Sequence, residues 1–411
     1  MNLFERSQEN LIKRRNNLIN GNVNSIPSPF IRFRNDFIGL EKGQYICVTS
    51  FTKGGKTQFV LNLLFEALCY YKDNPNAFKM KVFYFALEET DERILNRFES
   101  YLLLKLDKIR ISPKDLRSSS NDKPVPQDIL NLLSSDKYQE YIKLFLEVFE
   151  FDTVSNPTGI YLKCRKFAEE NGTIIRRKVK YKNDFGEIEE SDMGFDHYEP
   201  KNENLFVFPV IDHLGLVTPE RGQTLKEALD KVSKYCVELR NNYNFSPIVI
   251  QQQNTTNESN DSIKMDKIRP SGRGLADSSY IQRDVNLLLG LSSPFKFGVN
   301  SYFGYDITQF RDNIRFLKIV NNRDGEVGGI VALYFDGATT TFKELPIADE
   351  EHQVELQRWY NFLKKLRNPI KVETKSTNNL FYLYNNSKKE TLYGKCCNYF
   401  RKFWNRKINK C

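Results

Sequence analysis

Residues 50–57 read Ser-Phe-Thr-Lys-Gly-Gly-Lys-Thr, and they lie between a strand-like stretch and a helix-like stretch. The preceding residues 44–49 are short, β-branched and aromatic, as is typical of a buried strand. The following residues place apolar side chains at the spacing of one helix face, at Phe59, Val60, Leu63, Leu64, Ala67 and Leu68. A strand, a glycine-bearing loop that ends in Lys-Thr, and a helix together predict a phosphate cradle. The chain is therefore expected to bind a nucleoside triphosphate.

The expected cradle comprises Ser50, Phe51, Thr52, Lys53, Gly54, Gly55, Lys56 and Thr57. In such a loop, backbone N–H groups and the helix N-terminus face the anion, Lys56 reaches the outer phosphates, and the Thr57 hydroxyl can hold Mg²⁺. The usual G-x-x-x-x-G-K-[ST] pattern has glycine where this chain has Ser50, and serine resists positive φ. An ordinary surface turn with a chance Gly-Lys-Thr is the alternative, and the flanking strand and helix argue against it.

Length and composition fit a globular protein without disulfides. A chain of 411 residues, with 40% hydrophobic and 27% charged residues, is long enough to bury a full core. No apolar run approaches the roughly 20 residues that cross a bilayer, and the N-terminus has no apolar signal segment. Seven cysteines without a C-x-x-C pair, beside only three histidines, favour a reducing compartment and disfavour a zinc site. We therefore expect a cytoplasmic protein.

The net charge of +9 is concentrated near the C-terminus. Residues 388–411 carry eight Lys or Arg residues against Glu390 alone, which leaves +7 in this stretch. Within it, helical spacing relates the apolar side chains of Leu392, Cys396, Tyr399, Phe400 and Phe403. This basic amphipathic helix is expected to dock on the core. DNA, a partner protein and a membrane surface remain open as other binding partners.

Alternating strand-like and helix-like stretches predict an α/β fold, whose mostly parallel sheet is covered by helices on both faces. Strands are expected at residues 81–87, 149–152, 205–211, 247–250, 285–291, 314–320 and 329–335. Helices are expected at residues 128–149, 157–171 and 224–241, and after Thr90, which can cap the helix that follows it. Residues 173–204 interrupt this alternation and predict a β-hairpin insertion. The expected organisation is an N-terminal linker helix (1–28), a core domain (29–345) and a basic helical tail (346–411).

Two acidic residues at strand ends are candidates for nucleotide chemistry. The metal ion of a nucleoside triphosphatase needs a second carboxylate near the cradle, and hydrolysis needs a group that polarises water. Asp212 directly follows an apolar strand and fits the first role. Glu88 follows the strand that comes after the phosphate-binding helix and fits the second. Taken alone, Asp212 could instead cap the following loop, and Glu88 could be an ordinary solvated residue.

Four further segments follow the cradle in a fixed order. They read Phe85-Ala86-Leu87-Glu88, Val210-Ile211-Asp212-His213-Leu214-Gly215-Leu216, Ile250-Gln251-Gln252-Gln253-Asn254 and Asn321-Asn322-Arg323-Asp324-Gly325. In this order, the segments resemble the RecA-like motor domain of DnaB-type replicative helicases (superfamily 4). The resemblance covers about residues 26–345. Each later motif is short, so the collinear order makes the set specific.

The resemblance implies a role for one residue of each segment. Glu88 activates water, Asp212 anchors the metal ion, and Gln252 senses the γ-phosphate. Arg323 is an arginine finger that acts on the nucleotide of a neighbouring subunit. Asn321 departs from the family, which has a second cation at that position.

The resemblance also assigns residues 253–280 to a loop that faces DNA. Four cations near two glycines would grip phosphates there without reading bases, namely Lys264, Lys267, Arg269 and Arg273. Ala276 and Ser279 stand where the family has arginine and glycine. The hairpin at 173–204 is an insertion relative to the family, and we expect a surface decoration rather than a contact with DNA or a partner.

The implied function is an ATP-dependent DNA helicase motor that hydrolyses ATP at subunit interfaces and translocates on single-stranded DNA during replication. ATP and Mg²⁺ are the implied cofactors, and the implied assembly is a homo-hexamer with a primase or loader protein as a further partner. The helix at 3–20 resembles the family's linker helix, and the family's N-terminal scaffold domain has no counterpart in the sequence. A phage origin, with the host cytoplasm as location, suits this reduced architecture. A RecA-like recombinase or remodelling ATPase that does not unwind DNA is the main alternative, and a nucleotide-binding regulator with negligible turnover is a third.

Overall fold

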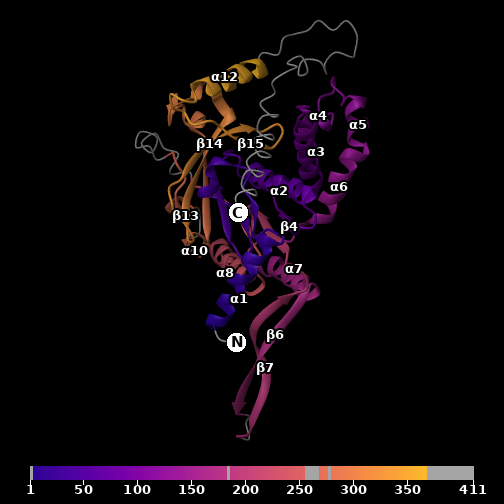
Figure 1. Ribbon diagram of the computed structural model, residues 1–411, viewed down its shortest axis with the longest axis vertical. Coiled ribbons are helices and arrows are strands. Elements are labelled where there is room, and N and C mark those ends of the chain that lie inside the picture. Colours follow the sequence, from indigo (N-terminus) through magenta and orange to yellow (C-terminus); the bar gives the residue numbers. More distant parts are fainter. Residues whose placement is uncertain (1–2, 183–185, 255–267, 276–278, 368–411) are drawn as a thin grey trace. The chain divides into compact units, whose positions relative to one another are not determined.

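The computed structural model describes residues 3–182, 186–254, 268–275 and 279–367 of the chain (Figure 1). The chain forms two units, Met1–Tyr360 and Asn361–Cys411, and the sheet described below lies within the first. The helices are α1 (Leu3–Ile19), α2 (Lys56–Asp73), α3 (Asp91–Asp107), α4 (Pro113–Leu116), α5 (Gln127–Leu133), α6 (Asp136–Val148), α7 (Pro157–Glu170), α8 (Leu225–Tyr243), α10 (Ser279–Asp284), α11 (Ile307–Phe310) and α12 (Gln353–Arg367). The strands are β1 (Ser25–Pro27), β2 (Gly39–Glu41), β3 (Ile46–Ser50), β4 (Lys79–Ala86), β5 (Phe149–Asp152), β6 (Gly172–Lys182), β7 (Ile188–Pro200), β8 (Leu205–Asp212), β9 (Ile248–Gln252), β10 (Leu287–Ser292), β11 (Ser301–Tyr302), β12 (Tyr305–Asp306), β13 (Ile314–Asn322), β14 (Ile330–Asp336) and β15 (Thr341–Glu344).

The large sheet has nine strands in the order β15-β14-β13-β10-β3-β9-β8-β4-β5. From β10 to β5 all neighbours pair in parallel, whereas β13, β14 and β15 form an antiparallel extension at one end. The predicted α/β fold with a mostly parallel sheet is confirmed. The antiparallel direction of β13 and β14 could not be read from their sequences, because apolar strands of either direction have the same pattern.

Helices cover both faces of the sheet (Figure 1). Helices α2, α3, α5 and α6 contribute to one hydrophobic cluster, and helices α7, α8 and α10 contribute to the other. Consecutive residues of β3 belong to different clusters, since Val48 lies in the first and Cys47 in the second. Alternate side chains of a strand point to opposite faces, so a strand buried on both sides reads as a continuous apolar run. Such a run is what residues 44–49 present.

Stacked aromatic rings form the centre of the first cluster. The ring centroids of Phe98 and Phe145 are 4.7 Å apart, and those of Phe145 and Phe149 are 4.4 Å apart. Phe65 of α2 lies 4.9 Å from Phe98, so the rings join α2, α3, α6 and the start of β5. Aromatic pairs in this distance range stabilise a core beyond the area they bury.

Helix starts follow the chain's capping residues. Thr90 accepts a hydrogen bond from the Arg93 N–H at the start of α3, as predicted. Thr224 and Glu227 form a capping box at the start of α8, in which each side chain accepts from the other residue's backbone N–H. The expected single helix at 128–149 is two helices, α5 and α6, which are separated by Ser134 and Ser135.

Strands β6 and β7 form the predicted hairpin, a separate two-stranded sheet that projects beyond the end of α7 (Figure 1). Its base is held by Tyr198, whose hydroxyl donates to the Ala168 carbonyl at 3.0 Å and whose ring lies 5.4 Å from that of Tyr243. The two ends of the hairpin meet where the Lys201 N–H donates to the Asn171 carbonyl at 2.8 Å. The insertion therefore leaves and rejoins the core at one point.

Two differences from the sequence expectation concern the ends of the core. The polar stretch at 20–28 contains β1, which pairs with β2, and Ile26 is fully buried in the core. Helix α1 precedes it and exposes several apolar side chains, namely Phe4, Leu11, Ile12, Leu18 and Ile19. In the tail, α12 is described, whereas the amphipathic stretch at 392–403 lies outside the described residues. No helix in the described part of the chain combines the length and the hydropathy needed to span a bilayer.

The aromatic centre predicts a large difference between two neighbouring substitutions on α6. Phe145 is fully buried, whereas Leu146 is 57% exposed. Phe145→Ala should lower the free energy of unfolding by about 3–5 kcal/mol, because it leaves a cavity in the ring cluster. Leu146→Ala should lower it by less than about 1 kcal/mol. Urea unfolding followed by circular dichroism measures both values, and equal losses would contradict this account of the core.

Candidate functional site

The phosphate cradle lies where strand β3 ends and helix α2 begins. Ser50 is the last residue of β3 and Lys56 the first residue of α2. Between them, Lys53 and Gly55 adopt positive φ angles of 58° and 94°. No side chain caps the first turn of α2, so its N–H groups face outward at the positive end of the helix dipole. This arrangement suits an anion.

Ser50 fits the cradle without backbone strain. It retains strand geometry, is fully buried, and donates from Oγ to the Phe51 carbonyl at 2.8 Å. The requirement for glycine is transferred to Gly54, where a Cβ would lie 2.3 Å from Ser50 Oγ and 2.6 Å from Ser50 Cβ. The concern that Ser50 resists positive φ is therefore wrong for this loop, because the turn uses Lys53 and Gly55 instead.

Asp212 meets the cradle at the end of strand β8. Its Oδ1 accepts from the Thr57 hydroxyl at 2.9 Å, and its Oδ2 accepts from the Tyr84 hydroxyl at 2.6 Å. Burial raises the pKa of Asp212 to about 6, although the two hydroxyl bonds oppose the rise and the nearby Glu88 and Glu89 add to it. The sequence brought Asp212 and Thr57 to attention, but not Tyr84. A tyrosine within an apolar strand is indistinguishable from a core residue until its hydroxyl partner is known.

Glu88 and Glu89 follow strand β4, and the structure separates their roles. Glu89 accepts two hydrogen bonds from Arg97, at 2.7 and 2.5 Å. Burial acts to raise the pKa of Glu89, but the Arg97 bonds outweigh it and hold the pKa below its usual value. The Glu88 carboxylate is half-exposed and lies 3.9 Å from His213 Nε2. Burial lowers the pKa of His213, with Glu88 opposing this and Lys56 adding to it, so these three side chains share one environment.

Gln252, at the end of strand β9, contacts the cradle directly. Its Nε2 donates to Thr52 Oγ1 at 2.6 Å. A residue that the sequence did not indicate approaches the same threonine, because Lys296 donates from Nζ to the Thr52 carbonyl at 2.9 Å. Lys296 lies in the 3₁₀ helix Pro294–Phe297, which follows β10. No motif marks Lys296, and only the packing of this loop against residues 50–57 identifies it.

The neighbouring Gln253 points to the candidate DNA-facing loop. Its amide Nε2 donates to Thr49 Oγ1 at 2.9 Å and to the Ser271 carbonyl at 3.1 Å, and its Oε1 accepts from the Ser271 N–H at 3.3 Å. Consecutive residues 252 and 253 thus reach the cradle and the candidate loop.

The four predicted cations of that loop have different standing. The Arg269 guanidinium lies 5.4 Å from the centre of the Phe303 ring. Arg273 lies in the 3₁₀ helix Gly272–Gly274. Lys264 and Lys267 lie outside the described residues.

Arg323 lies at the opposite edge of the sheet from the cradle. Asn322 pairs with Leu287, which in turn pairs with Ile46 at the beginning of β3. The length of β3 therefore separates Arg323 from Ser50, roughly 15 Å at the usual rise of a strand. The Arg323 guanidinium donates to the Arg283 carbonyl. It does not belong to the cradle of its own chain.

A second guanidinium lies beside Arg323. Burial and the nearby Arg323 both lower the pKa of Arg240, which donates to Asn286 Oδ1 at 2.7 Å. Asn321 itself donates to the Gln282 carbonyl at 3.4 Å. The missing cation at position 321 is thus accompanied by an arginine from α8 at the same edge.

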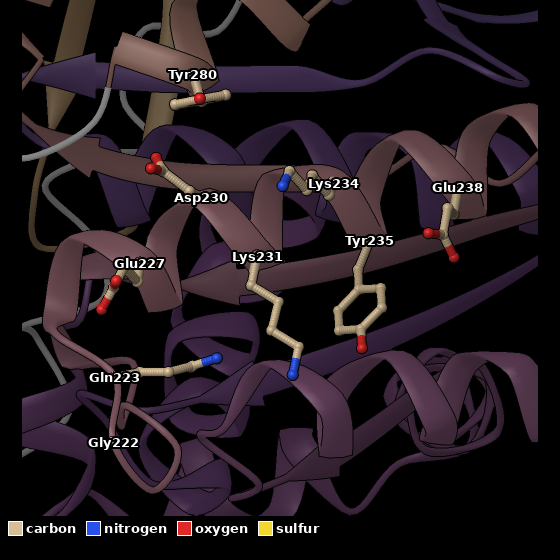
Figure 2. A pocket seen from close by; sticks show the side chains of 9 residues that line it. All are labelled: Gly222, Gln223, Glu227, Asp230, Lys231, Lys234, Tyr235, Glu238 and Tyr280. Carbon is tan, nitrogen blue, oxygen red and sulfur yellow. The ribbon is translucent and has the colours of Figure 1, made fainter.

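A polar hollow of about 530 Å³ lies along helix α8 (Figure 2). It is lined by Gly222, Gln223, Glu227, Asp230, Lys231, Lys234, Tyr235, Glu238 and Tyr280. Lys231 is engaged by Glu220, which also accepts from the Thr158 N–H at 2.9 Å. None of the cradle residues lines this hollow, and its charges alternate in sign, so it does not suit a polyphosphate. The cradle is the candidate site.

The raised pKa of Asp212 predicts how stability depends on pH. The carboxyl binds its proton more tightly in the folded chain than in the unfolded chain, so ionisation destabilises the fold as pH rises from about 4 to about 6. Between pH 4 and 8, wild type should therefore lose about 2–3 kcal/mol of unfolding free energy relative to Asp212→Asn, which does not titrate. Urea unfolding without Mg²⁺ and nucleotide measures the difference. A difference that stays constant across this range would contradict the assignment.

The fold matches solved ATPase domains of helicases. One solved structure, described as the ATPase domain of its protein, matches with a TM-score of 0.55 and 16% sequence identity, over 82% of this chain and 98% of that one. A DnaB-like replicative helicase, described with its interactions with primase, matches with a TM-score of 0.56 and 16% identity, over 82% of this chain and 66% of that one. No protein-family model and no curated protein sequence matches the chain. The chain therefore has the RecA-like fold of DnaB-type helicase ATPase domains, as its motifs implied.

Proposed function

We propose that this chain is an ATP-dependent DNA helicase motor that works as a ring of identical subunits. The carrying observation is the division of the catalytic residues between two edges of one sheet. Thr57, Asp212 and Glu88 gather at the cradle, whereas Arg323 lies at the opposite edge. A complete site needs the cradle of one subunit and the Arg323 edge of another, and head-to-tail contacts of this kind close into rings.

The oxygen atoms around the cradle suit Mg²⁺. Thr57 Oγ1 and Asp212 Oδ1 are 2.9 Å apart, and Mg²⁺ prefers hard oxygen ligands of this type together with substrate phosphates. Tyr84 holds the second carboxylate oxygen and so orients Asp212. When bound, the ion would neutralise charge on the β- and γ-phosphates. Lys56 and the N–H groups of the cradle would bind the same phosphates.

Glu88 and Gln252 supply the remaining functions of the cradle edge. Glu88 is the carboxylate that is not committed to Arg97, and its half-exposed position lets it orient and deprotonate a water molecule. Gln252 contacts Thr52 of the cradle, where its amide can respond to the γ-phosphate. Arg323 of the adjoining subunit, with Arg240 beside it, would stabilise the charge that develops during transfer. Arginine fingers contribute about 10³–10⁵ in rate.

The candidate DNA-facing loop is joined to this chemistry through Gln253 and Ser271. Its cations, with Arg269 described and Lys264, Lys267 and Arg273 assigned by resemblance, would grip the phosphates of single-stranded DNA without reading bases. Binding of this kind weakens steeply with salt. A homo-hexamer in the cytoplasm, with a primase or loader as a further partner, completes the proposal.

Lys56→Ala is expected to abolish ATP hydrolysis, because it removes the cation that reaches the outer phosphates. Arg323→Ala is expected to bind ATP as tightly as wild type and to lose hydrolysis, because the finger acts on the neighbouring site. Nucleotide titration and phosphate release, each with single-stranded DNA present, measure the two properties. Normal hydrolysis by Arg323→Ala would refute the finger assignment.

Mixing the two inactive variants tests whether the site is shared. A cradle from Arg323→Ala beside an Arg323 edge from Lys56→Ala restores a complete site, so mixed rings should regain part of the activity that each variant lacks alone. A double variant, Lys56→Ala with Arg323→Ala, is the matched control and should restore nothing when mixed with Lys56→Ala. Native mass measurement of the same samples and strand displacement from a forked duplex separate a ring helicase from an ATPase that only binds or remodels DNA.

A further inference from the structure

Arg315 of strand β13 is a charged side chain buried directly behind the cradle. It is 1% exposed, and its neighbours Ile314, Phe316 and Leu317 are buried apolar residues. Burial of a guanidinium is costly unless hydrogen bonds and charge compensate for the lost water. An apolar residue would fit the pattern of this strand, so the presence of arginine calls for a specific contact.

The guanidinium makes that contact with the backbone of the cradle. Its Nε donates to the Gly54 carbonyl at 2.9 Å. Its Nη1 donates to the carbonyls of Asp312 and Ile314, each at 2.8 Å, and its Nη2 donates to the Asp312 carboxylate at 2.9 Å. Asp312 is 68% exposed, so the charge partner lies at the surface while the guanidinium reaches inward.

An aromatic floor fixes both groups. The Arg315 guanidinium carbon lies 4.4 Å from the centre of the Phe335 ring. Gly55 packs on the same floor, because a Cβ at Gly55 would lie 3.5 Å from Phe335 and 3.6 Å from Phe342. The peptide that joins Gly54 to Gly55 is thus held from behind by a ring and by a guanidinium.

The geometry of the peptide bond turns this contact into a function. A trans peptide is planar, so its carbonyl and its N–H point in opposite directions. When Arg315 holds the Gly54 carbonyl inward, the Gly55 N–H of the same peptide is turned outward, toward the space where phosphate would lie. Both glycines lack the Cβ that would prevent this close approach.

We propose that Arg315 is a positioning residue for the nucleotide, which holds the Gly54–Gly55 peptide with its N–H directed at the phosphates. The proposal rests on the proposed function, in which residues 50–57 bind a nucleoside triphosphate. It assigns to β13, whose other end leads to Arg323, a second role in the same chemistry. Arg315 acts on the site of its own chain, whereas Arg323 acts on that of a neighbour.

The test compares nucleotide affinity in Arg315→Met, Arg315→Lys and Asp312→Asn, with Mg²⁺–ADP and Mg²⁺–ATP as the probes in titration calorimetry. Arg315→Met should weaken binding about tenfold to a hundredfold, the usual effect of losing one hydrogen bond from a charged donor. In steady-state hydrolysis, KM should rise while kcat changes by less than about threefold, as for loss of uniform binding. Arg315→Lys keeps the charge but not the planar fork and should fall between wild type and Arg315→Met.

Arg110→Met is the matched control for a merely structural role. Arg110 donates to Asp336, which is 2% exposed, at 2.6 and 2.9 Å, so its loss also leaves a buried group without its charge partner. The control leaves the bond between Arg315 and Gly54 in place. It should lower the thermal midpoint as Arg315→Met does and leave nucleotide affinity unchanged.

The outcomes separate this inference from the proposed function. If wild type binds neither nucleotide, the proposed function fails and the inference fails with it. If wild type binds and folded Arg315→Met binds equally tightly, the inference alone is overturned. Should Arg315→Met fail to fold, Arg315→Lys and Asp312→Asn decide: weakened binding in both supports the role, and wild-type affinity in either overturns it.

Discussion

The direction of the strands is the constraint on which the candidate site depends. Strands β3, β4, β8 and β9 are parallel neighbours, so their carboxyl ends meet at one edge of the sheet. That edge gathers residues from positions 57, 88, 212 and 252, which are far apart in the chain. The contact between Thr57 and Asp212, at 2.9 Å, joins the first turn of α2 to the end of β8. Strand β13 runs the other way, and this single reversal carries Arg323 to the opposite edge.

Much of the fold could be predicted from the sequence, because strands buried on both faces and amphipathic helices have distinct patterns. The strand before the cradle, the Thr90 cap and the hairpin were predicted and are present. Strand β1 was taken for a linker, because three residues with a proline carry too little pattern to reveal pairing with β2. Ser50 appeared to be a defect of the motif, yet the loop places its positive φ angles at Lys53 and Gly55.

The residues missed by sequence analysis share one physical property. Tyr84, Lys296 and Arg315 act through contacts with residues more than a hundred positions away in the chain, or with the backbone of such residues. No local pattern records such a contact. The predicted residues, in contrast, each follow a strand end or lie in the glycine loop, where local sequence and function coincide. Opposite charges are buried on two sides of the cradle, with Asp212 at its mouth and Arg315 behind it. Sites of this kind are held at some expense of stability.

The hairpin leaves and rejoins the core at the hydrogen bond between Lys201 and Asn171, with its base packed against α7 and α8. Because the two ends already meet, a short turn could bridge them without moving α7 or β8. Gain or loss of such a ribbon during evolution would leave the topology of the sheet unchanged. Related motors can therefore diversify at this point, acquiring or shedding an accessory arm while the nucleotide machinery stays the same.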